Sequence, residues 1–161
     1  SRVHIADSNL GMCQRMLEIS IARARARVTF GKPIIKRQAI RVKLANMAMM
    51  THALRCMVMD FATDYDKDPN GEYIAEKAAM CKLFSIDCTR LVSDEMLEIY
   101  GGDGYFEDAP FGETERLYRD CRAMWLEEGA PTVQRITIAR ELEKHNGRIE
   151  YDDWIAGTNL D

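Results

Sequence analysis

Apolar side chains recur at alternating steps of four and three residues over two long stretches of this chain, and this rhythm constrains the fold more than any other feature. Within Arg37 to Tyr65 the repeating positions are Ile40, Leu44, Met47, Thr51, Leu54, Val58 and Phe61. Within Ile74 to Tyr100 they are Ile74, Ala78, Cys81, Ser85, Cys88 and Val92. This spacing keeps the stripe on one side of an α-helix, as in the seam of an antiparallel bundle. The turn-forming residues 66–71 between the two stretches let the second helix fold back on the first.

The remainder of the chain also has helical rather than alternating periodicity. A wide apolar stripe predicts a helix from about Ile5 to Phe30, stopped by Gly31 and Pro33. A short helical segment follows around Thr114 to Met124, and Pro131 opens a last helix. We therefore expect an all-α fold, an antiparallel up-and-down helical bundle, over residues 1–146. The polar, acidic tail over residues 147–161 is expected to fray or to lie on a neighbouring surface.

Charge and hydropathy exclude several classes of function. The net charge is −4, so the chain lacks the clustered basic surface that a nucleic-acid binder needs to neutralise phosphates. No apolar run approaches the roughly 20 residues that span a bilayer, and the first residues do not have the layout of an export signal. We expect a protein of the cytoplasm, or of the mitochondrial matrix in a eukaryote. Because the sequence starts at Ser1 rather than at Met, we also expect a processed chain or a part of a longer protein.

The five cysteines stand at apolar positions and are odd in number, which indicates core thiols in a reducing compartment rather than a disulfide framework. They are Cys13, Cys56, Cys81, Cys88 and Cys121. No pair has CxxC spacing, and the three histidines are scattered along the sequence. A metal site is not expected.

Three short motifs carry polar chemistry, but each has a simple structural interpretation when taken alone. The stretch from Arg27 to Pro33 places a cation, a hydroxyl and an aromatic ring where the first helix ends, and an arginine there complements the helix dipole. The glycines of residues 101–104 supply positive φ or let the backbone approach a ligand closely. The pair Glu127 and Glu128 is an ordinary solvated surface pair if nothing else is considered.

Taken in order, these motifs resemble the C-terminal domain of the acyl-CoA dehydrogenases over about residues 2–143. The first part of the resemblance is carried by Arg27, Phe30, Gly31, Pro33, Ile34, Gln38, Leu44, Ala45 and Met47. The second part is carried by Gly101, Gly102, Gly104, Tyr105, Leu117, Arg119, Asp120, Glu128, Gly129, Val133, Gln134 and Arg135. So many landmarks in one order are hard to obtain by chance.

The resemblance implies an FAD-dependent enzyme that dehydrogenates an acyl-CoA thioester at its α and β carbons to a trans-2-enoyl-CoA. It implies a homodimer or homotetramer of three-domain subunits, with electron-transfer flavoprotein as the acceptor, and a single bundle domain that is inactive by itself. Two alternatives stay open. One is a flavin oxidase or monooxygenase on the same scaffold, and the other is a helical assembly module without catalysis.

The resemblance also assigns a catalytic base and two substrate contacts. Glu128 lies nine residues after Arg119 and six before Gln134, as the base of the family does, and it would take the α-proton. The N–H of Gly129 would face the thioester carbonyl, and Arg2 would lie near the same end of the substrate. Some members carry the base one residue before the arginine that matches Arg2, where this chain has Ser1.

The remaining assigned residues would contact FAD. Arg27 and Thr29 would bind the phosphates of a neighbouring subunit's FAD, with Phe30 and Gln38 at its adenine end. The backbone of Glu98, Gly101 and Gly102 would line the same cofactor, and Ala130 to Thr132 would meet FAD from the other side. Two positions depart from the family pattern, because Glu98 replaces a glutamine and Ala130 replaces a threonine whose hydroxyl would cap the last helix. These departures predict weaker FAD binding than in typical members.

Overall fold

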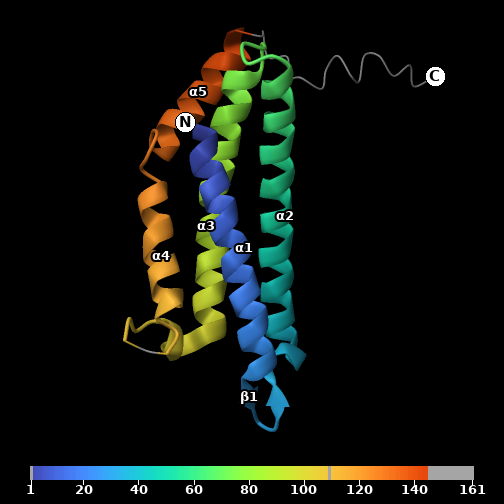
Figure 1. Cartoon of the computed structure of the whole chain (residues 1–161), viewed down its shortest axis with the longest axis vertical. Coiled ribbons are helices and arrows are strands. Elements are labelled where there is room, and N and C mark those ends of the chain that lie inside the picture. Colours follow the sequence, from blue (N-terminus) through green and yellow to red (C-terminus); the bar gives the residue numbers. More distant parts are fainter. Residues whose placement is uncertain (1, 109, 145–161) are drawn as a thin grey trace, which may run out of the picture.

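The computed structural model describes residues 2–108 and 110–144. Its helices form four roughly parallel columns, each called a rod below. The helices α1 (Arg2–Ala26), α2 (Gln38–Lys67) and α3 (Ile74–Tyr100) each form one rod. The shorter helices α4 (Gly112–Met124) and α5 (Pro131–Lys144) follow one another along α3 and together form the fourth (Figure 1). The predicted all-α, up-and-down bundle is confirmed, and α2 and α3 begin and end within two residues of the predicted bounds.

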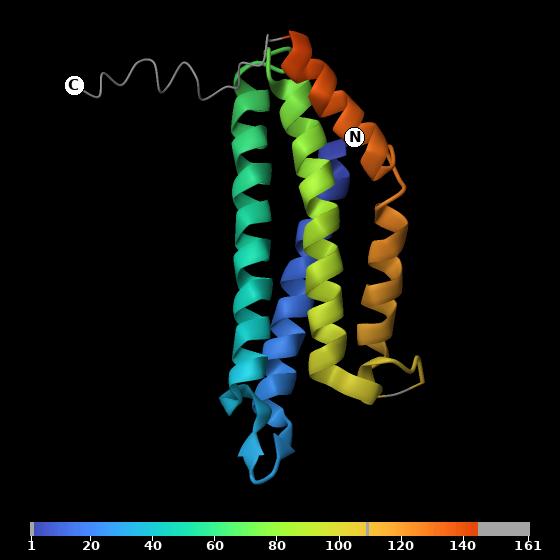
Figure 2. The ribbon, with the colours of Figure 1, turned by 180° about the vertical axis from the view of Figure 1, so that it is seen from behind.

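The third helix is the centre of the bundle, because α3 packs against each of α1, α2, α4 and α5 (Figure 2). Its predicted stripe contributes the buried residues Cys81, Ser85, Cys88 and Val92. A second stripe with the same four-and-three spacing is also buried and consists of Ala79, Lys82, Ile86, Thr89, Ser93 and Met96. Burial on two faces therefore makes α3 the scaffold from which the other elements are positioned.

The first helix ends earlier than the sequence predicts. It stops at Ala26, and residues 27–33 form a hairpin of β1 (Val28–Thr29) and β2 (Lys32–Pro33) in place of the expected continuation to Phe30. The connection is the pair Phe30 and Gly31, with φ of 50° and 75°. Positive φ at both residues matches the right-handed twist of the paired strands, and Gly31 adopts it without steric cost. A short 3-10 turn, η1 (Ile34–Lys36), then leads into α2.

Buried polar and thiol groups link the helices as well as apolar contacts do. Asn9 of α1 donates from Nδ2 to Ser85 Oγ of α3 at 2.9 Å, and Tyr100 donates its hydroxyl to the Ile19 carbonyl at 3.1 Å. Four of the five cysteines are buried as predicted, whereas Cys56 is exposed on α2. Burial raises the pKa of the Cys81 thiol to about 11 and that of Cys88 to about 12, which keeps both protonated at neutral pH.

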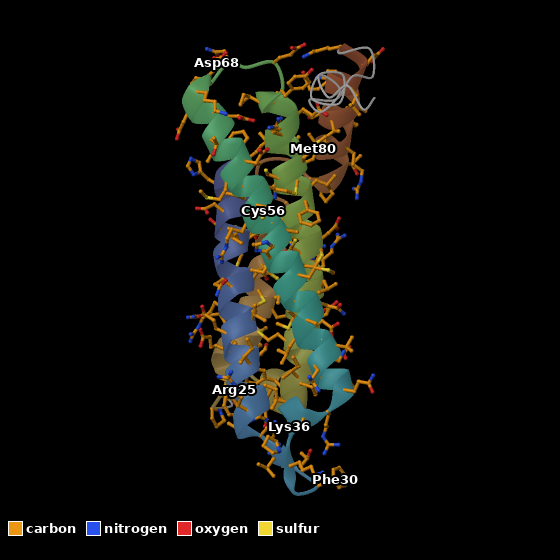
Figure 3. All side chains as sticks on the ribbon, turned by 90° about the vertical axis from the view of Figure 1, so that its right-hand side faces the viewer. Arg25, Phe30, Lys36, Cys56, Asp68 and Met80 are labelled. Carbon is orange, nitrogen blue, oxygen red and sulfur yellow. The ribbon has the colours of Figure 1, made fainter. Side chains whose placement is uncertain are left out.

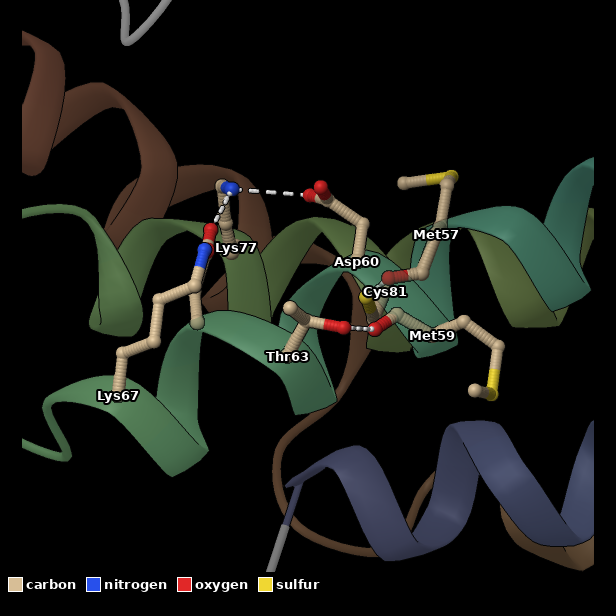
Figure 4. A network of polar contacts seen from close by, with 8 residues as sticks. Met57, Met59, Asp60, Thr63, Lys67, Lys77 and Cys81 are labelled. Atoms are coloured by element: carbon tan, nitrogen blue, oxygen red, sulfur yellow. Dashed lines mark hydrogen bonds and ion pairs between the residues drawn. The ribbon is translucent and has the colours of Figure 1, made fainter.

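Ion pairs near the α2–α3 turn hold these two helices together. Lys77 of α3 binds Asp60 at 2.9 Å and also Asp64, both on α2 (Figure 4). Hydrogen bonds from Lys77 and Lys67 hold the pKa of the Asp64 carboxyl below its usual value. One turn further along α3, Cys81 Sγ contacts the Met57 carbonyl at 3.4 Å.

The described residues 2–108 and 110–144 contain neither a membrane-spanning helix nor a cluster of metal-binding side chains. None of the helices there is long and apolar enough to cross a membrane. No group of three or more His, Cys, Asp or Glu side chains within them could hold a metal ion. The predicted tail, residues 147–161, lies outside the described part of the chain, as does Ser1.

Candidate functional site

The predicted site residues separate into two groups toward opposite ends of the bundle. One group lies around the start of α1 and the linker between α4 and α5. The other lies around the β1–β2 hairpin and the end of α3, at the far end of the molecule (Figure 1). We call them the cleft end and the hairpin end.

The cleft end is defined by a hollow of about 930 Å³ between the start of α1, the end of α2, the start of α3 and the α4–α5 linker. Its apolar wall is formed by Val3, Val58, Met59, Phe61, Ala62, Ile74, Ala75 and Ala78. Its polar side chains come from Arg2, His4, Asp7, Tyr65, Asp66, Asn70 and Glu128. Arg2 and Glu128 are 126 positions apart in the sequence, and the fold brings both to this one cleft.

Glu128 stands in a turn that few non-glycine residues adopt. Its φ is 54°, and that of Gly129 is 98°. The buried side chain of Gln134 donates from Nε2 to the carbonyls of Glu128, at 2.9 Å, and Gly129, at 3.1 Å. A Cβ atom at position 129 would lie 2.7 Å from that same nitrogen, so a larger residue there would displace the Gln134 side chain as well as strain the backbone. Backbone of this kind is uncommon for a non-glycine residue, and the surrounding structure must compensate for its strain.

The two neighbouring glutamates differ in position. Glu127 and Glu128 are both exposed within the described residues, but only Glu128 is among the side chains that line the cleft. Burial of the Glu128 carboxylate, which a strong general base needs, therefore requires surface from outside these residues.

A buried lysine under the linker was missed by the sequence analysis. Lys82 is 0% exposed, and its Nζ donates to the carbonyl of Met124, the last residue of α4. Burial lowers the pKa of Lys82, while the negative charges of Glu127 and Glu128 act in the opposite direction. Two turns along the same face of α3, Thr89 accepts a hydrogen bond from Trp125 Nε1 at 3.0 Å. The sequence signal that could have indicated the burial of Lys82 is its spacing, because Lys82 and Thr89 both belong to the second four-and-three stripe of α3.

At the hairpin end, a second residue that the sequence analysis missed holds the predicted ones. Arg37 donates from Nη2 to the carbonyl of Thr29 at 2.9 Å and to its hydroxyl at 2.6 Å. Its guanidinium carbon lies 5.2 Å from the centre of the Phe30 ring. Phe30 is nevertheless 95% exposed and projects from the tip of the hairpin (Figure 3). Arg27 and Gln38 are exposed nearby, at the start of the hairpin and of α2.

The end of α3 completes this region. Lys43 of α2 forms ion pairs with Glu95, at 2.6 Å, and with Glu98, so the negative charge that Glu98 introduces is compensated from within the chain. Hydrogen bonds to the two carboxylates raise the pKa of Lys43. Gly101 has a φ of 63°, and an added Cβ at Gly101 or Gly102 would meet no atom within 4 Å. The glycine backbone here is therefore open to a ligand.

This arrangement fits FAD. An exposed guanidinium at Arg27 suits a diphosphate, the exposed Phe30 ring offers a face to a planar group, and the open glycine backbone offers close approach. At the other end, Ala130 and Thr132 flank Pro131 at the start of α5. The Ala130 carbonyl accepts the first bonds of that helix from Val133, at 2.9 Å, and Gln134, at 3.2 Å.

Comparisons with known proteins identify the family of this chain. Residues 1–143 match the family model described as "Acyl-CoA dehydrogenase, C-terminal domain". The probable acyl-CoA dehydrogenase YngJ of Bacillus subtilis is 39% identical over 143 residues, which cover 89% of this chain and 36% of that protein. Acryloyl-CoA reductase (NADH) of Anaerotignum propionicum is 35% identical over 144 residues, covering 89% and 35%.

The fold is shared as well. The structure of butyryl-CoA dehydrogenase from Megasphaera elsdenii superposes with a TM-score of 0.80 at 31% identity, covering 88% of this chain and 36% of that one. The chain thus spans about a third of the length of these relatives. It belongs to the acyl-CoA dehydrogenase family, of which it is the C-terminal helical domain.

Proposed function

We propose that this chain supplies the base and part of the FAD site of an enzyme that dehydrogenates an acyl-CoA thioester to a trans-2-enoyl-CoA. One observation carries the proposal. Glu128 stands in a left-handed turn on the wall of a cleft that it shares with Arg2. The turn is held by the buried Gln134, so the carboxylate is presented from a fixed backbone.

The chemistry of the cleft follows from Glu128 and Arg2, which line it, and from Gly129, the residue after Glu128. The carboxylate of Glu128 takes the proton from the α carbon, which develops enolate character on the thioester oxygen. The N–H of Gly129 donates to that oxygen, and its interaction strengthens as negative charge builds. Arg2 orients the thioester end of the substrate. FAD, when bound, accepts the hydride that leaves the β carbon.

The hairpin end is proposed to hold the FAD of a neighbouring subunit. Arg27 and Thr29 bind its phosphates, and Phe30 and Gln38 contact its adenine end. The backbone of Glu98, Gly101 and Gly102 lines the same cofactor. Ala130 and Thr132, at the cleft end, contact the FAD of their own subunit. Because the two groups lie toward opposite ends of one bundle, this assignment requires a homodimer or homotetramer.

The partners follow from the same proposal. The substrate is an acyl-CoA, and electron-transfer flavoprotein reoxidises the flavin. The compartment is the cytoplasm, or the mitochondrial matrix in a eukaryote.

Anaerobic titration of the full-length protein tests the function directly. We expect a yellow, FAD-containing protein that is bleached by one of a series of straight, branched and aromatic acyl-CoAs, with an enoyl-CoA as product. Because one relative is named as a reductase, enoyl-CoA with NADH is assayed in parallel. Rapid reoxidation by air with release of hydrogen peroxide would favour an oxidase instead. A colourless protein inert toward every acyl-CoA would favour an assembly module.

A further inference from the structure

We propose that Lys82 is a positioning residue for Glu128: its buried ammonium group fixes the end of α4 and thereby holds the turn that presents the base to the cleft. The inference rests on the proposed role of Glu128. It concerns a residue that is not among those lining the cleft.

The burial of Lys82 is the first observation behind this proposal. The side chain is 0% exposed in the middle of α3, on a stripe otherwise made of small, hydroxyl and apolar residues. An ammonium group inside a bundle is costly unless its charge and its donors are used. Stability alone therefore gives no reason for a lysine here, whereas methionine would fill the same space.

The contact of Lys82 shows what the charge does. Its Nζ donates to the Met124 carbonyl, at the last residue of α4. The final carbonyls of a helix have no partner within the helix, and a cation there also complements the helix dipole. Met124 lies four residues before Glu128, so this bond sets where the helix stops and where the turn begins.

Two further bonds make the linker rigid. Trp125 is held to Thr89 of α3 before the turn, and Gln134 of α5 holds the Glu128 carbonyl after it. The negative charges of Glu127 and Glu128 are also the groups that act electrostatically on Lys82. One turn before Lys82, Ala78 of the same helix lines the cleft. The wall of the cleft and the support of the base thus come from one stretch of α3.

The decisive experiment uses Lys82→Met in the full-length, FAD-loaded enzyme. Methionine keeps the apolar stem but removes the charge and the donor. We expect the limiting rate of flavin reduction by saturating acyl-CoA to fall about 10- to 100-fold, the loss typical of a misplaced catalytic group. The substrate concentration that gives half the limiting rate should change little. The Tm should stay equal or rise, because a buried charge has been removed.

Lys77→Met is the matched control. Lys77 lies on the same helix and is ion-paired with Asp60 and Asp64 of α2 (Figure 4). This variant should lose some stability and keep the rate of flavin reduction. A lower rate of flavin reduction together with an equal or higher Tm in Lys82→Met supports positioning. A Lys82→Met rate equal to that of the parent, or a rate and Tm that fall together, overturns it.

Two further variants, Lys82→Gln and Glu128→Gln, complete the experiment. If Lys82→Met does not fold, Lys82→Gln, which keeps an N–H donor without charge, is measured per bound FAD under the same criteria. Glu128→Gln is included to test the base itself. If that variant is fully active, the proposed base is wrong, and amide hydrogen exchange of residues 125–130 then decides the role of Lys82. Faster exchange of these amides in Lys82→Met than in Lys77→Met would show that Lys82 holds the turn. Equal exchange in the two variants would overturn the proposal.

Discussion

The cleft end and the hairpin end are held in different ways. At the cleft end, the buried side chains of Lys82 and Gln134 bond the backbone before and within the turn of Glu128, at the carbonyls of Met124 and Glu128. At the hairpin end, Thr29 and Phe30 are held by the exposed Arg37, and the Phe30 ring is left open to solvent. A group that transfers a proton needs a rigid backbone, whereas a surface that receives a ligand together with another subunit needs accessible groups. The difference predicts that substitutions at the cleft end act on rate and those at the hairpin end on cofactor affinity.

The largest effect is expected from Glu128→Gln in the full-length enzyme. The amide keeps the shape of the side chain but cannot take the α-proton. General-base catalysis typically contributes about a hundred- to ten-thousand-fold, and the loss should reach the upper end of that range. The single-turnover rate of flavin reduction measures it, with FAD content checked by absorbance.

Glu127→Gln is the matched control for this prediction, because Glu127 is exposed beside the base but does not line the cleft. It should cost far less. If the Glu127 variant is the inactive one, the assignment through this turn is wrong by one residue. If both variants reduce flavin at the parent rate, the base lies elsewhere, most simply at the first-helix position before Arg2.

Gly129→Ala tests the rigidity of the cleft end through the backbone. The new Cβ would stand 2.7 Å from Gln134 Nε2, at a φ of 98°. Strain of this kind costs about 1–3 kcal/mol, so we expect a lower Tm together with a loss of flavin reduction of roughly a hundredfold. Gly11→Ala is the control, because Gly11 lies inside α1 with no atom within 4 Å of an added Cβ. That change should raise the Tm, and a fall of equal size in both variants would contradict the explanation.

Arg37→Ala probes the hairpin end. It removes the bonds to the Thr29 carbonyl and hydroxyl, so the segment proposed to bind FAD phosphates loses its support. We expect FAD affinity to fall about tenfold, or roughly 1.4 kcal/mol, by fluorescence titration of the apoenzyme. At saturating FAD the limiting rate of flavin reduction should not change. Arg55→Ala, which removes an exposed bond from α2 to Gln14 of α1, should leave FAD affinity as it was. A loss of rate in FAD-saturated Arg37→Ala would remove the distinction between the two ends.

The fold could be predicted from the sequence where the type and spacing of the residues directly indicate which of them are buried. The four-and-three stripes of α2 and α3 are such a case, because apolar residues at helical spacing indicate burial directly. The end of α1 could not be placed, because nothing in residues 27–30 breaks the helical pattern. The positive φ of Phe30 arises only once Val28 and Thr29 pair with β2.

The candidate site shows the same limit. The spacing of Glu128 from Arg119 and Gln134 singles out one carboxylate, and the cleft contains that carboxylate together with Arg2. Lys82 and Arg37 were missed for a physical reason. Lysine and arginine side chains are usually solvated. Only the tertiary packing buries Lys82 and brings Arg37 into hydrogen-bonding contact with Thr29 of the hairpin.

The smallest expected effect is a difference between the two ends in how stability depends on pH. The guanidinium group of an arginine stays charged throughout the accessible pH range, whereas burial lowers the pKa of the Lys82 ammonium group below its ordinary value of 10.5. Between that lowered pKa and 10.5 the unfolded chain binds the proton more tightly than the folded one. A rise in pH through this window therefore relieves the cost of the buried charge and favours folding.

The measurement is the difference in Tm between Lys82→Met and the parent from pH 8 to pH 10.5. Buried thiols such as Cys81 and Cys88, whose pKa values are raised, destabilise both proteins as the pH rises, and they cancel in the difference. We expect any advantage of Lys82→Met at pH 8 to shrink by a few degrees as pH rises, since about 1 kcal/mol shifts the Tm of a domain this size by roughly 2–4 °C. The same comparison for Arg37→Ala should show a constant offset. If the Tm difference between Lys82→Met and the parent is also independent of pH, the buried ammonium group does not destabilise the folded protein. The contrast between the buried Lys82 and the exposed Arg37 would then rest on geometry alone.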